Sequence, residues 1–169
     1  MADLENIDGF IGAIRTGDVK GRREAVKAVV ACGSDAVDPL ISALATAEDN
    51  DVRWYLARAL GMIGEPAIDS LIYLLTVSED PATAKYAAAA LGEMGEVALE
   101  PLIELLDDEE PQIRGFSALA LGRMGEPAIK RLVALIEESD GLRKRCAKMA
   151  LYRMGGEGTE ALARSMMDE

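Results

Sequence analysis

Few side chains in this sequence could carry acid–base or metal chemistry. The chain has no histidine, so the side chain that most often serves as a general base or as a nitrogen ligand for metals is absent. Its two cysteines, Cys32 and Cys146, lie far apart and lack the close spacing of metal sites and redox pairs. There is no phosphate-binding glycine loop and no nucleophile beside an activating base. We therefore expect no catalytic residue, no metal site and no cofactor, and an enzyme is the minor hypothesis.

Acidic residues are the most abundant groups that could bind a ligand or a partner. The chain has 30 Asp and Glu against 18 Lys and Arg, which gives a formal net charge of −12. It lacks the D-x-[DN]-x-[DN]-G loop of a calcium site, and the run DDEE at 107–110 is interpreted as a solvated turn that ends in a helix cap. The negative charge repels phosphate backbones and anionic lipids. It therefore argues against nucleic acid and membranes as partners.

The first ten residues, MADLENIDGF, contain three acidic residues and no basic one, which argues against a signal or transit peptide. No apolar run approaches the length that spans a bilayer. We expect a cytoplasmic protein.

An internal repeat predicts the elements that must position any site. The string ALGMIGEPAIDSLIYLL at 59–75 recurs in similar form at 90–106 and at 120–136. Its second half has apolar residues at i, i+3, i+4 and i+7, namely Ile68, Leu71, Ile72 and Leu75, which predicts an amphipathic helix. Its first half pairs an alanine with an aliphatic residue in every copy, which predicts a first helix whose backbone approaches its neighbours closely. The chain is predicted to be all-α.

Glycines and acids mark the predicted helix ends. A glycine stands where each first helix must stop and a positive φ is favoured, at Gly33, Gly64, Gly95, Gly125 and Gly155. An acid stands where each first helix begins and is predicted to cap it, at Asp18, Asp49, Asp80, Glu110 and Asp140. Four residues later a mostly basic column, Arg22, Arg53, Ala84, Arg114 and Lys144, is predicted to form ion pairs within the helix or with the acid of a neighbouring repeat.

These signals predict a single domain over residues 1–169. We expect an N-terminal capping helix at 3–15 and five two-helix repeats at about 18–47, 49–78, 80–108, 110–138 and 140–167, which makes eleven helices. Both cysteines share columns with apolar or aromatic residues, so we expect them in the core.

The stretch 49–136, with VR near the start of a first helix and ALG-x-[IM]-G-E-[PV]-A-[IL] across the turn, resembles the short HEAT-like repeats named after phycobilisome lyases. The resemblance implies a right-handed α-α superhelix, a HEAT-like solenoid whose second helices line the concave side. The named lyases attach bilin chromophores as paired subunits, but no residue here matches a carrier of that chemistry. HEAT-type hydroxylases need histidine ligands for iron, and HEAT-like DNA glycosylases need a basic groove, so both activities are excluded.

Two exposed aromatic residues and a set of acids are the candidate binding residues. Trp54 and Tyr73 stand in columns that are not core columns. Trp54 is expected either to stack on Arg23 or Lys85 as a cation–π contact or to anchor a partner, because Trp and Tyr dominate interface hot spots. The second helices expose the acids Asp38, Asp69, Glu100, Glu104 and Asp107.

Two functions remain open. The first is a monomeric scaffold whose acidic concave surface binds a basic or amphipathic segment of a partner protein. The alternative is a subunit, catalytic or not, of a bilin lyase-like protein-modifying complex.

Overall fold

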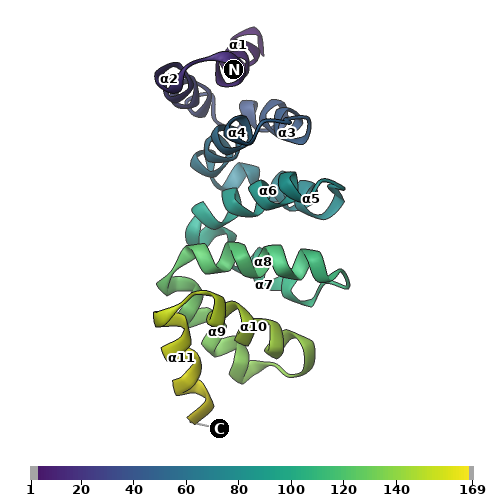
Figure 1. Cartoon of the computed structure of the whole chain (residues 1–169), viewed down its shortest axis with the longest axis vertical. Coiled ribbons are helices and arrows are strands. Elements are labelled where there is room, and N and C mark those ends of the chain that lie inside the picture. Colours follow the sequence, from purple (N-terminus) through teal and green to yellow (C-terminus); the bar gives the residue numbers. More distant parts are fainter. Residues whose placement is uncertain (1–3, 168–169) are drawn as a thin grey trace. The chain divides into compact units, whose positions relative to one another are not determined.

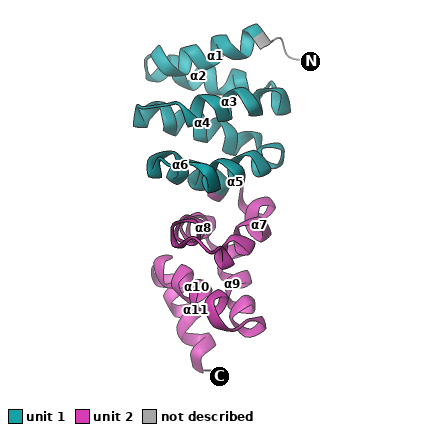
Figure 2. Ribbon diagram, turned by 90° about the vertical axis from the view of Figure 1, so that its right-hand side faces the viewer, with its two compact units in different colours: residues 1–91 teal, residues 92–169 magenta. Residues whose placement is uncertain are grey.

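The computed structural model describes residues 4–167, and within that range it contains only helices and the turns between them (Figure 1). Eleven α-helices follow one another along this part of the chain, so the predicted all-α fold is confirmed there. The helices form two compact units, residues 1–91 and 92–169, and the division falls inside α6 (Figure 2). The expected first residue of the capping helix, at position 3, lies outside the described residues. The single domain expected over 1–169 stays a prediction.

Unit 1 contains a lone N-terminal helix, two helix pairs and most of α6. Its helices are α1 (Leu4–Thr16), α2 (Val19–Val30), α3 (Val37–Ala45), α4 (Asn50–Ile63), α5 (Ile68–Val77) and α6 (Pro81–Glu93). The 3-10 turns η1 (Gly33–Ala36) and η2 (Glu65–Ala67) join the two helices of each complete pair. The first helices α2 and α4 pack against each other, and so do the second helices α3 and α5. Unit 1 therefore has one layer of first helices and one layer of second helices.

Unit 2 repeats this arrangement. After the end of α6 come η3 (Gly95–Ala98), α7 (Leu99–Glu104), η4 (Leu105–Asp107), α8 (Pro111–Met124), α9 (Glu126–Glu138), α10 (Gly141–Arg153) and α11 (Gly156–Met167). The first helices α8 and α10 are in contact, and the second helices α9 and α11 are in contact. The helix pairs α8–α9 and α10–α11 are thus stacked in register.

The core of both units is made from the repeated apolar columns. The alanine and leucine that open each copy of the repeat are almost completely buried, at Ala59 and Leu60, Ala90 and Leu91, Ala120 and Leu121, and Ala150 and Leu151. A small residue beside a large one lets the first helices approach closely while the leucine fills the space between layers. The predicted core residues Cys32 and Cys146 are only half-buried, and both thiols are free. Cys32 follows the last residue of its helix by two positions, and Cys146 lies at the edge of a surface groove described below, so neither reaches the interior.

The predicted helix ends are confirmed in the backbone. Gly33, Gly64, Gly95, Gly125 and Gly155 all have positive φ, between 60° and 80°. Asp18 and Asp49 accept hydrogen bonds from the backbone N–H of Gly21 and Val52, at 2.8 and 2.9 Å. Asp80 accepts from the backbone N–H groups of Ala82 and Thr83.

The capping prediction is wrong for the side chains of Glu110 and Asp140. Both residues occupy the N-cap position, but neither side chain makes a capping hydrogen bond. Glutamate has one methylene more than the short side chains that favour this position, so its carboxylate reaches the N–H groups of the first turn less readily. The loop before α8 is held instead by the carboxylate of Asp108, which accepts from the backbone N–H of Glu110 at 2.9 Å.

Arg53 makes the bridge to a neighbouring repeat that the basic column predicts. Its Nη2 lies 2.7 Å from Oδ2 of Asp80, the capping acid of the next repeat. Arg22 instead donates to the carbonyl oxygen of Arg15 at 3.4 Å, with its guanidinium 5.7 Å from the centre of the Tyr55 ring. These arginines therefore tie consecutive helix pairs together within unit 1.

Asp80 → Asn tests the importance of this charged cap. Hydrogen bonds from the Ala82 backbone N–H and the Thr83 hydroxyl, together with the charge of Arg53, hold the pKa of Asp80 below its ordinary value of 3.8. A carboxyl group whose pKa is lowered by folding stabilises the folded state above its unfolded pKa, and this contribution is lost as the pH falls through the folded value. We expect Asp80→Asn to lower the free energy of unfolding in urea at neutral pH, and the difference from wild type to shrink as the pH falls below 3.8. Asp140→Asn, at a cap position without a side-chain cap, is the control and should change little; equal losses for both variants would contradict the assignment.

The last helix is packed through small residues. The buried positions of α11 are Gly158, Ala161 and Ser165, whereas the preceding second helix, α9, buries Ala128, Leu132, Leu135 and Ile136. A Cβ on Gly158 would overlap the carbonyl oxygen of Leu151 and would lie 2.7 Å from Cβ of Met154. Gly158 is therefore required by close contact with α10.

Gly158→Ala should consequently destabilise the chain by about 1–3 kcal/mol, the usual cost of overpacking a tight site. Gly156→Ala is the matched control, because a Cβ at Gly156 meets nothing within 4 Å. The control should be neutral or slightly stabilising, since it reduces the entropy of the unfolded chain. Thermal and urea unfolding of both variants measures this, and an equally stable Gly158→Ala variant would show that α11 does not pack as described.

Candidate functional site

The residues proposed from the sequence as binding residues lie on exposed surfaces of both units. In unit 1, Asp38 is on α3, Asp69 and Tyr73 are on α5, and Trp54 is on α4. In unit 2, two further acids are on α7 and one is in η4; these are Glu100, Glu104 and Asp107. Within unit 1, α3 packs beside α5, so Asp38 and Asp69 stand at equivalent positions on adjacent second helices. The Tyr73 side chain is one turn along from Asp69 and is 66% exposed.

Two of the proposed acids are already paired with arginines of this chain. The Glu100 carboxylate receives a two-pronged contact from Arg131, with Nε–Oε1 and Nη2–Oε2 distances of 2.6 and 3.2 Å. Arg131 also contacts Glu138 at 3.1 Å, and these hydrogen bonds, chiefly those to Glu100, raise the pKa of Arg131 above its ordinary value. Asp107 lies 3.3 Å from Nε of Arg143. Glu100 and Asp107 therefore contribute less negative potential than their exposure suggests, whereas Asp38, Asp69 and Glu104 have no ion-pair partner among residues 4–167.

Trp54 makes a cation–π contact, but the predicted partner is wrong. The guanidinium carbon of Arg58, four residues along the same helix, lies 5.4 Å from the ring centre, in place of Arg23 or Lys85. The ring also meets Tyr55 edge to face, with ring centres 4.8 Å apart. Trp54 remains 44% exposed and borders a groove of about 320 Å³ between α2 and α4, whose other residues include Arg23, Lys27 and Met62.

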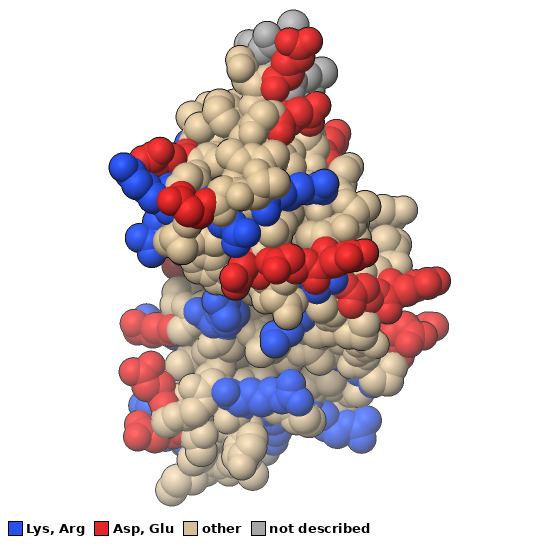
Figure 3. All heavy atoms as spheres, turned by 45° about the horizontal axis from the view of Figure 1, so that its top comes forward, with Lys and Arg blue, Asp and Glu red and all other residues tan. Residues whose placement is uncertain are grey.

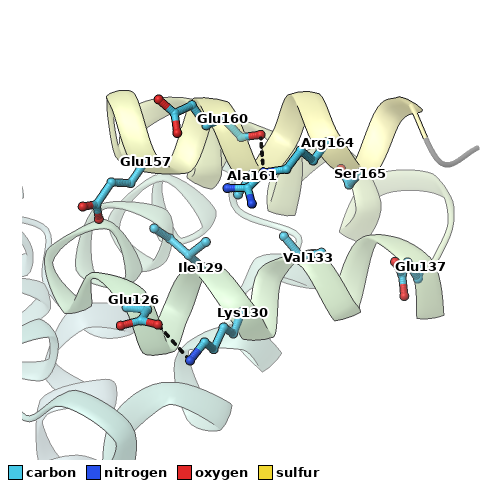
Figure 4. Close-up of a pocket in the computed structure, with 10 residues that line it drawn as sticks. All are labelled: Glu126, Ile129, Lys130, Val133, Glu137, Glu157, Glu160, Ala161, Arg164 and Ser165. Carbon is cyan, nitrogen blue, oxygen red and sulfur yellow. Dashed lines mark hydrogen bonds and ion pairs between the residues drawn. The ribbon is translucent and has the colours of Figure 1, made fainter.

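A larger groove, of about 580 Å³, lies between the second helices α9 and α11 of unit 2 (Figure 4). Ile129 and Val133 of α9 point toward α11, which faces them with the small side chain of Ala161. Because α11 buries glycine, alanine and serine, it brings too little side-chain volume to fill this space. One feature of the sequence could have indicated this groove: at the α11 positions that match Ile129 and Val133, the residues are smaller. Residue types alone, however, do not give the volume that is left between two helices.

The rim of this α9–α11 groove is acidic. Glu126 and Lys130 form an ion pair of 2.8 Å, which lowers the pKa of Glu126 and raises that of Lys130 through their mutual hydrogen bond. The remaining charged rim residues are three acids, Glu137, Glu157 and Glu160, and a single base, Arg164. Arg164 donates from Nε to the backbone carbonyl of Glu160 at 3.4 Å, so it neutralises none of the three carboxylates by direct pairing (Figure 4).

Among residues 4–167, no three Cys, Asp or Glu side chains converge as a metal site would require. No helix in the same range is both long and apolar enough to cross a bilayer.

Charge reversal at Glu100 and Glu104 distinguishes a paired acid from an unpaired one. Glu100→Lys removes the contact with Arg131 and places two cations together, so we expect a loss of stability on the order of 1 kcal/mol. Glu104→Lys, on the same helix, should stay within about 0.5 kcal/mol of wild type. Urea unfolding measures both. Equal stability of the two variants would mean that the Glu100–Arg131 pair is not formed in solution.

Comparison with known proteins supports the repeat. A family model described as HEAT repeats matches residues 7–76 and 68–152. No curated protein sequence matches the chain significantly. Among solved structures, the complex of CpcE and CpcF of phycocyanin lyase from Nostoc sp. PCC7120 is 23% identical, with a TM-score of 0.49 over 88% of this chain and 99% of the other.

Two artificial proteins are also similar. An engineered protein is 22% identical with a TM-score of 0.34, over 98% of this chain and 87% of its own. A computationally designed armadillo repeat protein for modular peptide recognition is 18% identical with a TM-score of 0.34, over 94% of this chain and 87% of its own. The HEAT repeat model covers most of the sequence, and the stacked helix pairs of each unit are the arrangement that such repeats form. The chain belongs to the HEAT repeat family.

Proposed function

We propose that this protein is a binding scaffold whose α9–α11 groove takes a basic, amphipathic segment of a partner protein. The observation that carries the proposal is the groove itself, which combines an apolar floor with an acidic rim. Its volume of about 580 Å³ is in the range of known ligand pockets, which run from about 300 to 1,000 Å³. An amphipathic helix that lays its apolar side into such a groove is a common mode of peptide recognition.

The chemistry of the rim selects the partner's charge. Ile129 and Val133 are half-buried and would lose their remaining exposure under apolar side chains of the partner. Glu137 on α9 and Glu160 on α11 approach from the two sides, so lysines or arginines flanking the apolar residues would meet carboxylates at both edges. Because these carboxylates are exposed, their main effect is on the rate of encounter and on selectivity against acidic segments.

Unit 1 offers a second surface for the same function, made by Asp38, Asp69 and Tyr73 on α3 and α5. The two acids have no ion-pair partner within residues 4–167 and Tyr73 is exposed, which suits a contact with a basic segment. Tyr73 is 66% exposed, whereas Ile129 and Val133 are already half-buried in a groove, so we assign the unit 1 surface a smaller share of the binding energy than the α9–α11 groove.

The second candidate function is a subunit of a bilin lyase-like complex, favoured by the repeat signature at 49–136. In such a complex the grooves would also bind a protein, because this chain would position a protein substrate while another subunit supplied the chemical step. Absorbance changes on mixing with a bilin would separate this candidate from a scaffold.

Binding of a fluorescein-labelled peptide tests the proposed groove. The probe is a helical peptide with leucines on one face and lysines on the other, titrated by fluorescence anisotropy at low and high salt. We expect Glu137→Lys combined with Glu160→Lys to weaken binding by about tenfold or more, since two rim charges are reversed. Wild-type affinity should fall as the ionic strength rises.

Asp38→Lys combined with Asp69→Lys is the matched variant for the unit 1 surface, and Glu24→Lys on the first helix α2 is the control. The control should bind like wild type. If the unit 1 variant loses the peptide while the groove variant keeps it, the α9–α11 assignment is wrong.

A further inference from the structure

The first helices of unit 2 carry a charge opposite to that of the chain as a whole. Helix α10, GLRKRCAKMALYR, has no acidic residue, and its basic residues are Arg143, Lys144, Arg145, Lys148 and Arg153. Its neighbour α8 also lacks acids and adds Arg114 and Arg123. Figure 3 shows Lys and Arg exposed on one face of the molecule, in several places beside Asp and Glu. Arg123 and Arg143 are ion-paired with Glu93 and Asp107, but α8 and α10 together still have more basic than acidic side chains, in contrast to the net charge of −12.

A groove of about 360 Å³ runs between these two helices. Its apolar residues include Leu142 and Met149, which are 37% and 58% exposed. Gly115 of α8 contributes to the hollow, because a Cβ at this position would meet nothing within 4 Å. Exposed apolar side chains in a concave site, rimmed by charge, are typical of a place where another molecule docks.

Three arginines line this α8–α10 groove, and no acidic residue does. Arg114 is held in place, because its Nη1 donates to the carbonyl oxygens of Asp108 and Glu109 at 2.7 and 2.9 Å. Arg145 and Arg153 are exposed and have no hydrogen-bond or ion-pair partner among residues 4–167. Two guanidinium groups are thus available beside an apolar floor.

The same helix positions form a groove in unit 1. Between α2 and α4, Arg23, Lys27 and Arg58 surround the exposed ring of Trp54. In the repeat, Arg23 matches Gly115 and Trp54 matches Arg145. A basic and apolar groove between adjacent first helices is therefore a product of the repeat geometry and occurs in each unit separately.

We propose that the α8–α10 groove binds an acidic, amphipathic segment of a partner protein. Apolar side chains of the segment would cover Leu142 and Met149, and its Asp or Glu carboxylates would pair with Arg145 and Arg153, whose planar guanidinium groups match a carboxylate in geometry. Nucleic acid fits less well, because the groove lacks the aromatic side chains on which bases stack. This surface lies on other helices than the α9–α11 groove and selects the opposite charge.

An acidic peptide is a demanding probe, because a chain with a net charge of −12 repels it everywhere except at a local basic site. The probe is a fluorescein-labelled helical peptide with leucines on one face and glutamates on the other, titrated against the full chain by anisotropy. Arg145→Glu should weaken binding by about tenfold or more, since one charge-assisted contact is replaced by repulsion. Lys85→Glu is the matched control, because Lys85 is an exposed residue of the same repeat column on α6 in unit 1.

Gly115→Leu separates binding from folding. The added side chain would fill the α8–α10 groove, and it replaces a residue that is unfavourable inside a helix, so the melting temperature should not fall. We expect this variant to lose the acidic peptide and to keep the lysine-rich peptide. Loss of both peptides would instead show that the substitution disturbs the unit.

Three results would overturn the proposal. The first is an Arg145→Glu variant that binds the acidic peptide no more weakly than Lys85→Glu does. The second is tighter binding of a single-stranded RNA probe that Arg145→Glu abolishes, which would make the surface a nucleic-acid site. The third is self-association of the wild-type chain in sedimentation that Arg145→Glu abolishes, which would make the occupant a second copy. None of these depends on the α9–α11 groove, which the lysine-rich peptide reports independently.

Discussion

The structure depends on the burial of an alanine and a leucine near the C-terminal end of the first helices α4, α6, α8 and α10. A single helix pair exposes this column on one side, so it is covered only when another pair stacks against it. Ala120 and Leu121 in α8, and Ala150 and Leu151 in α10, are covered in this way within unit 2. Because every repeat must keep these residues, the inner positions are uniform and the outer positions are free to differ. Specific function therefore has to lie in the outer columns and in the gaps between adjacent helices.

In unit 2, the residues of the outer columns place positive and negative charges on different helices. The first helices α8 and α10 are basic, whereas the rim between the second helices α9 and α11 is acidic. The net charge of a molecule determines its electrostatic potential at long distance. A partner that is bound in one groove interacts mainly with the few charges within about 10 Å of that groove, because salt screens the others. The value of −12 thus excludes little about a local contact. The same value underlies the expectation of a basic or amphipathic partner segment for the concave surface.

The sequence predicts the fold because each helix is specified by local signals. The positive-φ glycines, the caps at Asp18, Asp49 and Asp80, and the apolar columns all act within one or two turns of helix. The site is less predictable because it depends on contacts between repeats. Glu100 and Arg131 are 31 residues apart and meet only when α9 is in place. The predicted partner of Trp54 was also wrong, because the cation–π contact is made by Arg58, four residues along the same helix, and not by a residue of a neighbouring repeat.

The grooves were not predicted from the sequence, because they form where the side chains of adjacent helices are too small to fill the space between them. Gly115 in α8 and Ala161 in α11 are ordinary residues in the sequence, and only the stacked helices show that no neighbour fills the space beside them. Volumes and pairings across repeats are properties of the assembled layers, which residue spacing alone does not determine.

The central claim is that unit 2 has two binding faces that select partners of opposite charge. Amide hydrogen exchange of the whole chain, measured alone and then with the lysine-rich or the glutamate-rich peptide, tests this claim most directly because it locates each contact. We predict slower exchange in α9 and α11 with the lysine-rich peptide, and in α8 and α10 with the glutamate-rich peptide. Protection of the same helices by both peptides, or of none in unit 2, would contradict the account.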